Sequence, residues 1–190
     1  MRRHSVLMTG LAVLALTAGL AVAQQTAQAP PAPAAGLAGE ALLAWNGIGH
    51  KLVAMAEDFP EDKYDFKPRP EVRTFAETLL HVAGTNYVFI SAIKGEKVGP
   101  GTENPPRSTY KTKADVVALL KKSVEDGAAL TKEKGDAGMT HAVKFPYANR
   151  MVSTLYCIMD GAEHSGEHYG QLAVYYRLNG MVPPASRPRQ

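Results

Sequence analysis

Four segments of the sequence place their apolar residues at the three-to-four-residue spacing of an α-helix, and this pattern restricts the possible folds most strongly. The segments cover about residues 39–57, 74–94, 112–135 and 149–178. No segment shows sustained alternation of apolar and polar residues between turn signals, so we expect no sheet. The sequence therefore predicts an all-α fold, a bundle in which four amphipathic helices bury their apolar faces against one another.

Capping residues and helix breakers set the expected boundaries. Gly135 marks the expected end of the third helix, and Asn149 is the expected N-cap of the fourth. Two capping boxes are expected at the helix starts, Thr74 with Glu77 and Thr112 with Asp115.

The connection between the second and third helices, residues 95–111, is long. A hairpin between antiparallel helices needs only a few residues. Because this connection is long enough to cross the bundle, we expect the second and third helices to run parallel.

The first 23 residues resemble a secretory signal peptide. Arg2 and Arg3 form a basic start, an apolar run covers residues 6–22, and Ala21-Val22-Ala23 provides a cleavage site. An uncleaved membrane anchor is the alternative, but the apolar core is short and Ala-rich for a spanning helix. We therefore expect a secreted or periplasmic protein that does not stay in the membrane after cleavage.

The remaining chain divides by composition. Residues 24–38 are rich in Ala and Pro and are expected to form a disordered spacer. Residues 39–184 are the expected bundle, and residues 185–190 are a tail. Removing residues 1–23 lowers the formal charge from +3 to +1, which gives no basic surface for a nucleic acid partner.

A pair of histidines four residues apart stands in the fourth helical segment. His164 and His168 lie about 40° apart on one helix face, so both imidazoles can reach one metal ion. Neutral imidazole suits zinc, nickel, copper or iron. Two hydrogen-bonded histidines without a metal are the alternative. Apolar residues at helical spacing around the pair indicate that it faces inward, namely Cys157, Ile158, Leu172 and Tyr175.

A third histidine, His81, lies in the middle of the second helical segment among apolar residues. A lone histidine in such a place is usually a hydrogen-bonded core residue. Three central histidines in one small bundle instead favour a metal site built on facing helices, with coordination positions left for water or substrate. We interpret His50 and His141 as non-ligands, and Cys157, the only cysteine, as a small buried apolar residue.

The segment from His164 to His168 also matches the H-x-x-E-H pattern of inverted zinc peptidases. Those enzymes need a further acidic ligand downstream, and no acidic residue follows Glu167, so we exclude that class. Glu167 is a candidate for polarising a metal-bound water and fits a solvated helix-face charge equally well.

Three stretches are similar to the DinB-like (DinB/YfiT) family: residues 78–83 around His81, residues 164–172, and residues 175–184. The resemblance implies a four-helix bundle of up-down-down-up order and a metal site formed by His81, His164 and His168. It also implies that the chain can form a homodimer. Some family members are thiol-dependent transferases or isomerases. Tyr169 stands where the family often has Arg.

Two classes of function follow from these observations. A divalent ion such as zinc, nickel or iron, held with open positions, can support a metal-dependent transferase or hydrolase acting on a small-molecule substrate. The alternative is a metal-binding or interaction bundle without catalysis.

Overall fold

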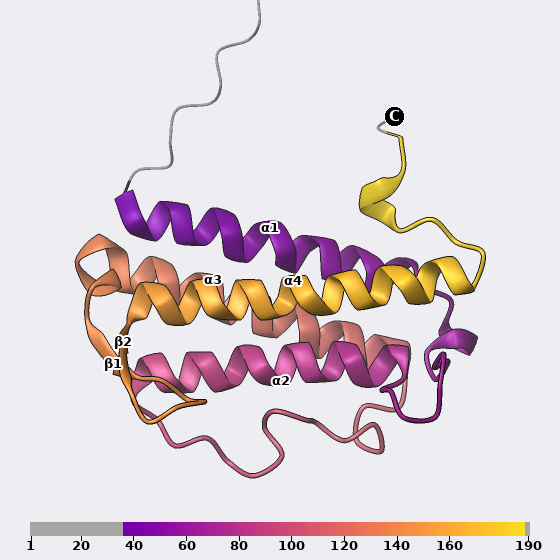
Figure 1. Ribbon diagram of the computed structural model, residues 1–190, viewed down its shortest axis with the longest axis horizontal. Helices are drawn as coiled ribbons and strands as arrows, with labels where there is room; N and C mark the ends of the chain where they lie inside the picture. Colours follow the sequence, from indigo (N-terminus) through magenta and orange to yellow (C-terminus); the bar gives the residue numbers. More distant parts are fainter. Residues whose placement is uncertain (1–35, 189–190) are drawn as a thin grey trace, which may run out of the picture. The chain divides into compact units, whose positions relative to one another are not determined.

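The computed structural model describes residues 36–188 of the chain. The predicted signal peptide, residues 1–23, and most of the predicted spacer, residues 24–38, lie outside the described residues. The predicted four-helix bundle is confirmed (Figure 1). Its elements are α1 (Gly36–Asp58), α2 (Phe75–Lys94), α3 (Lys113–Met139) and α4 (Thr154–Leu178), strands β1 (Ala142–Lys144) and β2 (Met151–Ser153), and 3-10 turns at Glu61–Lys63 and Pro184–Ser186. None of the described helices is both long and apolar enough to cross a membrane.

Both predicted capping boxes are present. The Thr74 hydroxyl accepts a hydrogen bond from the backbone N–H of Glu77, and the Glu77 carboxylate accepts one from the N–H of Thr74. Thr112 and Asp115 repeat this exchange at the start of α3. These bonds satisfy N–H groups that have no partner inside the helix, and they fix where α2 and α3 begin.

Helix α1 begins at Gly36, inside the segment predicted as a spacer. The carboxylate of Asp136, near the end of α3, accepts a hydrogen bond of 2.8 Å from the N–H of Ala38. A free N–H in the first turn is satisfied in this way by a side chain 98 residues away. Local composition gives no sign of that partner. The start of the first helix was therefore predicted too far along the chain, at about residue 39.

Helix α3 does not end at Gly135. This glycine adopts a non-helical conformation with φ 56° and ψ −177°, and the helix resumes for one further turn up to Met139. Met139 is fully buried in the core, so its packing favours continuation of the helix after the interruption.

The expectation of no sheet was wrong for one short hairpin. Residues 142–144 pair in antiparallel fashion with residues 151–153, and α4 begins after them at Thr154 rather than after Asn149. Ser153 caps α4 by accepting a hydrogen bond from the N–H of Tyr156. Strands of three residues are too short to show the alternation from which a strand is predicted.

Helices α2 and α3 start at the same end of the bundle. The N–H of Lys113 donates to the carboxylate of Glu61, in the turn after α1, and the N–H of Ala76 donates to the carbonyl of Tyr64 in that same region. The connection over residues 95–112 therefore travels the length of α2 before α3 begins (Figure 1). This path places the connection against α2.

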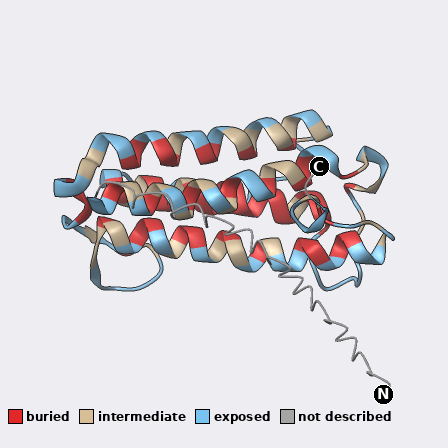
Figure 2. Cartoon of the chain, turned by 90° about the horizontal axis from the view of Figure 1, so that it is seen from above, coloured by how far each residue is buried: buried red, intermediate tan, exposed pale blue. Residues whose placement is uncertain are grey.

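Buried residues lie on the inward faces of the helices (Figure 2), and the apolar ones among them form two clusters. The first cluster contains the stacked rings of Phe59 and Phe75, whose centroids are 3.9 Å apart. The second is built around Trp45. On α4, no buried member of either cluster lies between Ile158 and Leu172. A polar layer can therefore form between the two apolar clusters.

Asp136→Ala is expected to lower the free energy of unfolding by about 1 kcal/mol, because the first turn of α1 loses its side-chain acceptor. Chemical denaturation measures this loss, and hydrogen exchange should show faster exchange at Ala38. Glu133→Ala, which removes an exposed acid from the same helix, is the control and should change the value by less than about 0.5 kcal/mol. Equal effects of the two substitutions would contradict the capping role.

Candidate metal centre

The three histidines that the sequence singled out meet in the polar layer. His81 comes from α2, while His164 and His168 come from one face of α4, which packs against α2. The Nε2 atom of His164 is 3.2 Å from Nε2 of His81 and 3.1 Å from Nε2 of His168. One nitrogen from each ring lies within 4.8 Å of the other two. Three nitrogens at these separations can surround one ion.

Hydrogen bonds on the outer nitrogens fix which ring atoms face inward with lone pairs. Nδ1 of His81 lies 3.3 Å from the backbone carbonyl oxygen of Glu103 and 3.0 Å from Oδ1 of Asn104. A carbonyl oxygen only accepts, so Nδ1 donates, and Nε2 of the neutral ring keeps its lone pair. Nδ1 of His168 donates in the same way to Oε1 of Gln171 at 2.9 Å.

The inward nitrogens therefore have a shortage of protons. If Nε2 of His164 carries a proton, it can donate to only one of the two neighbouring Nε2 atoms. The lone pair of the other neighbour then has no donor. Nδ1 of His164 is buried and has no hydrogen-bond partner among the described residues. A cation among the three nitrogens satisfies all the inward lone pairs together, so the donor set fits a metal ion.

Burial keeps the three rings neutral. His81 and His168 are each 7% exposed, and desolvation is the largest cause lowering the pKa of every ring in the group. The pKa of His164 falls to about 3, to which the neighbouring histidines and the Arg73 guanidinium also contribute. Only a neutral imidazole offers a lone pair to a metal, so burial prepares these side chains for coordination.

A close contact between the crossing connection and α2 supports His81. A Cβ atom at Gly84 would lie 2.3 Å from the carbonyl oxygen of Thr102 and 2.5 Å from that of Glu103. Glycine at this position lets the connection approach α2, and Asn104 can then reach His81. Oδ1 of Asn104 also accepts a hydrogen bond of 3.1 Å from Arg73.

The sequence analysis did not identify Asn104 and Gln171 as hydrogen-bond partners of the histidines. Gln171 could have been found, because it follows His168 by three residues on the same helix face. Asn104 gave no signal, because it lies 23 residues from His81 and reaches it only through the path of the connection.

The other residues considered from the sequence lie outside the cluster. Glu167 is exposed on α4 and is not in the ligand group, although its charge raises the pKa of His168 slightly against the effect of burial. His50 and His141 are exposed. Cys157 is fully buried in the second apolar cluster, and burial raises the pKa of its thiol to about 11.

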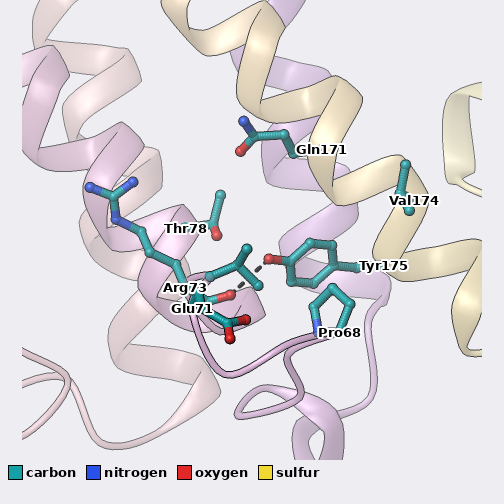
Figure 3. A pocket seen from close by; sticks show the side chains of 8 residues that line it. Pro68, Glu71, Arg73, Thr78, Gln171, Val174 and Tyr175 are labelled. Atoms are coloured by element: carbon teal, nitrogen blue, oxygen red, sulfur yellow. Dashed lines mark hydrogen bonds between the residues drawn. The ribbon is translucent and has the colours of Figure 1, made fainter.

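A cavity of about 740 Å³ lies beside the cluster, between the segment before α2 and the second half of α4 (Figure 3). Two of its residues connect it with the histidines: Thr78 lies one turn before His81, and Gln171 holds the ring of His168. The full lining consists of Pro68, Glu71, Val72, Arg73, Thr78, Gln171, Val174 and Tyr175.

Comparisons with known proteins agree with the resemblance seen in the sequence. The model of the DinB superfamily matches residues 44–172. A DinB-like protein from Bacillus cereus shares 18% identity, covers 76% of this chain and 93% of its own, and gives a TM-score of 0.62. YfiT from Bacillus subtilis, described as a probable metal-dependent hydrolase with an unusual four-helix bundle topology, shares 14% identity over 76% of this chain and 88% of its own, with a TM-score of 0.55. Identities this low show a shared fold. No curated protein is significantly similar in sequence.

Gly84→Ala is expected to lower the free energy of unfolding by about 1–3 kcal/mol, because the new methyl group pushes against backbone oxygens of the connection. Gly47→Ala is the matched control. Its Cβ would meet nothing within 4 Å, so this helical substitution should raise stability by up to about 1 kcal/mol. Chemical denaturation compares the two, and a stabilised Gly84→Ala protein would contradict the tight contact.

The metal-free protein is expected to lose stability in acid. Between its ordinary pKa of 6.5 and its folded pKa of about 3, His164 binds a proton more readily in the unfolded chain than in the folded one. The contribution of His164 to the free energy of unfolding is therefore complete above pH 6.5 and declines as the pH falls below that value. Denaturation at several pH values, with a chelator present, should show a shallower decline for His164→Gln. His50→Gln, which changes an exposed histidine, should leave the decline unaltered.

Proposed function

The chain belongs to the DinB superfamily, and from this membership together with its three converging histidines we propose that it binds one divalent metal ion. His81, His164 and His168 are the proposed ligands, each through Nε2. The observation that carries the proposal is the meeting of three Nε2 atoms, because a proton on His164 can satisfy at most one of the neighbouring lone pairs. Imidazole nitrogens suit zinc, nickel or iron.

The proposed activity is that of a metal-dependent hydrolase or transferase acting on a small molecule. Three protein ligands leave coordination positions open, which is typical of reactive rather than structural sites. The cavity beside the histidines offers room for a substrate. The description of YfiT as a probable metal-dependent hydrolase supports the same class of activity.

The roles of the chain's own residues follow from their contacts. A bound ion supplies Lewis acidity toward a substrate oxygen. Asn104 and Gln171 hold the rings of His81 and His168 in the orientation that directs Nε2 inward. The two apolar clusters on either side limit the access of water to the polar layer. Glu167 is exposed and is not one of the proposed ligands.

We also propose that the protein acts after export, in the periplasm or outside the cell. The basic start, apolar run and small-residue cleavage site of residues 1–23 support this.

Elemental analysis of the untagged protein tests the metal proposal. The wild type is expected to carry about one divalent ion per chain, and His164→Ala/His168→Ala should lose it, because two of the three ligands are gone. His50→Ala/His141→Ala removes two exposed histidines and should retain the ion. A wild type that takes up no zinc, nickel or iron after reconstitution would refute the proposal and leave an interaction bundle as the better interpretation.

A further inference from the structure

We propose that the cavity beside the histidines binds a small organic monocarboxylate with an apolar body, and that Arg73 pairs with its carboxylate. The inference rests on the proposed function in one respect, because the ligand is taken to be the molecule presented to the metal.

Arg73 supplies a positive charge that the protein itself does not neutralise. Within residues 36–188 five ion pairs are formed, and Arg73 takes part in none of them. Its guanidinium donates one hydrogen bond, to the neutral side chain of Asn104. Arg73 also lines a smaller adjoining cavity together with Arg107, which differs because it is already bonded to Asp65. The remaining N–H donors of Arg73 are free to hold a carboxylate through two parallel bonds.

The charges around the histidine group favour an anionic ligand over a neutral one. The ligand group consists of three neutral imidazoles and contains no carboxylate. The Arg73 guanidinium lies close to this group, because it and Nδ1 of His81 both donate to Oδ1 of Asn104. A divalent ion there adds two positive charges close to that of Arg73. An anionic ligand between the ion and Arg73 reduces the repulsion, whereas a neutral ligand does not.

The walls of the cavity fit an apolar body. Pro68 and Val72 line the cavity from the segment before α2, and Val174 and Tyr175 line it from α4, where Val174 is 52% exposed. The Tyr175 hydroxyl donates a hydrogen bond of 2.7 Å to the backbone carbonyl of Arg73, which ties this wall to the arginine (Figure 3). Covering exposed apolar walls is favourable for a hydrocarbon or aryl group.

The position of Glu71 restricts the charge of the ligand. Glu71 also lines the cavity; its exposed carboxylate lies 3.9 Å from the Arg69 guanidinium, and Figure 3 shows it directed away from the Arg73 guanidinium. A second negative group on the ligand would meet this carboxylate. The cavity therefore favours a single carboxylate, held at the end nearer Thr78 and Gln171. Its volume of about 740 Å³ is within the usual range for small-molecule sites.

Binding of 4-phenylbutyrate and of the neutral 4-phenylbutan-1-ol, measured by calorimetry on the zinc-loaded and the metal-free full chain, tests the inference. The acid should bind wild type at least tenfold more tightly than the alcohol in both forms, because a charge-assisted pair forms with Arg73. Arg73→Gln should weaken the acid about tenfold and leave the alcohol unchanged. Arg73→Lys keeps the positive charge but not the planar guanidinium, and it should weaken binding of the acid by less than Arg73→Gln does. Arg177→Gln removes an exposed charge from α4 outside the cavity and should have no effect.

The outcomes separate this inference from the metal proposal. An acid preference that requires zinc and survives in Arg73→Gln would show the carboxylate on the metal, and would overturn the role of Arg73. Equal binding of acid and alcohol to wild type would overturn it as well. If the protein takes up no metal but the acid preference persists and depends on Arg73, the carboxylate site stands and the metal proposal fails. Circular dichroism of each variant confirms that the bundle is intact.

Discussion

The rest of the structure depends on the meeting of three imidazole nitrogens in the middle of the bundle. Burying three polar rings between two apolar clusters has a cost that an uncharged core would not have. Hydrogen bonds from Nδ1 of His81 and His168 offset part of that cost. The inward nitrogens have too few protons to satisfy one another, so the arrangement fits a cation. Burial in this layer also lowers the pKa values of the three rings.

The long connection after α2 helps to form the site, because it supplies hydrogen-bond acceptors to His81. Because α2 and α3 start at the same end of the bundle, the chain has to return along α2 after α2 ends. Gly84 lets this segment lie against the helix, where Glu103 and Asn104 provide acceptors for His81. The order of the helices and the orientation of one proposed ligand are therefore coupled through a single close contact.

Asn104 connects the buried layer with the surface. Its side-chain oxygen accepts hydrogen bonds from both His81 and Arg73, so the ring orientation and the position of the guanidinium depend on the same atom. The Tyr175 hydroxyl holds the backbone of Arg73 from the opposite wall of the cavity. A ligand that pairs with Arg73 would thus be positioned by the same network that directs His81 toward its partners.

The sequence by itself determined the four helices, both capping boxes and the identity of the three histidines, because these features depend on short-range spacing. It failed where the deciding contact lies far along the chain. Asp136 caps the first turn of α1 at Ala38 from 98 positions away. The hairpin before α4 was missed for another reason, because its strands of three residues are too short to show alternation. Only the tertiary structure decided that Asn104 supports His81 and that Arg73 lines the cavity, because the path of an irregular connection is fixed by packing and not by the periodicity of its residues.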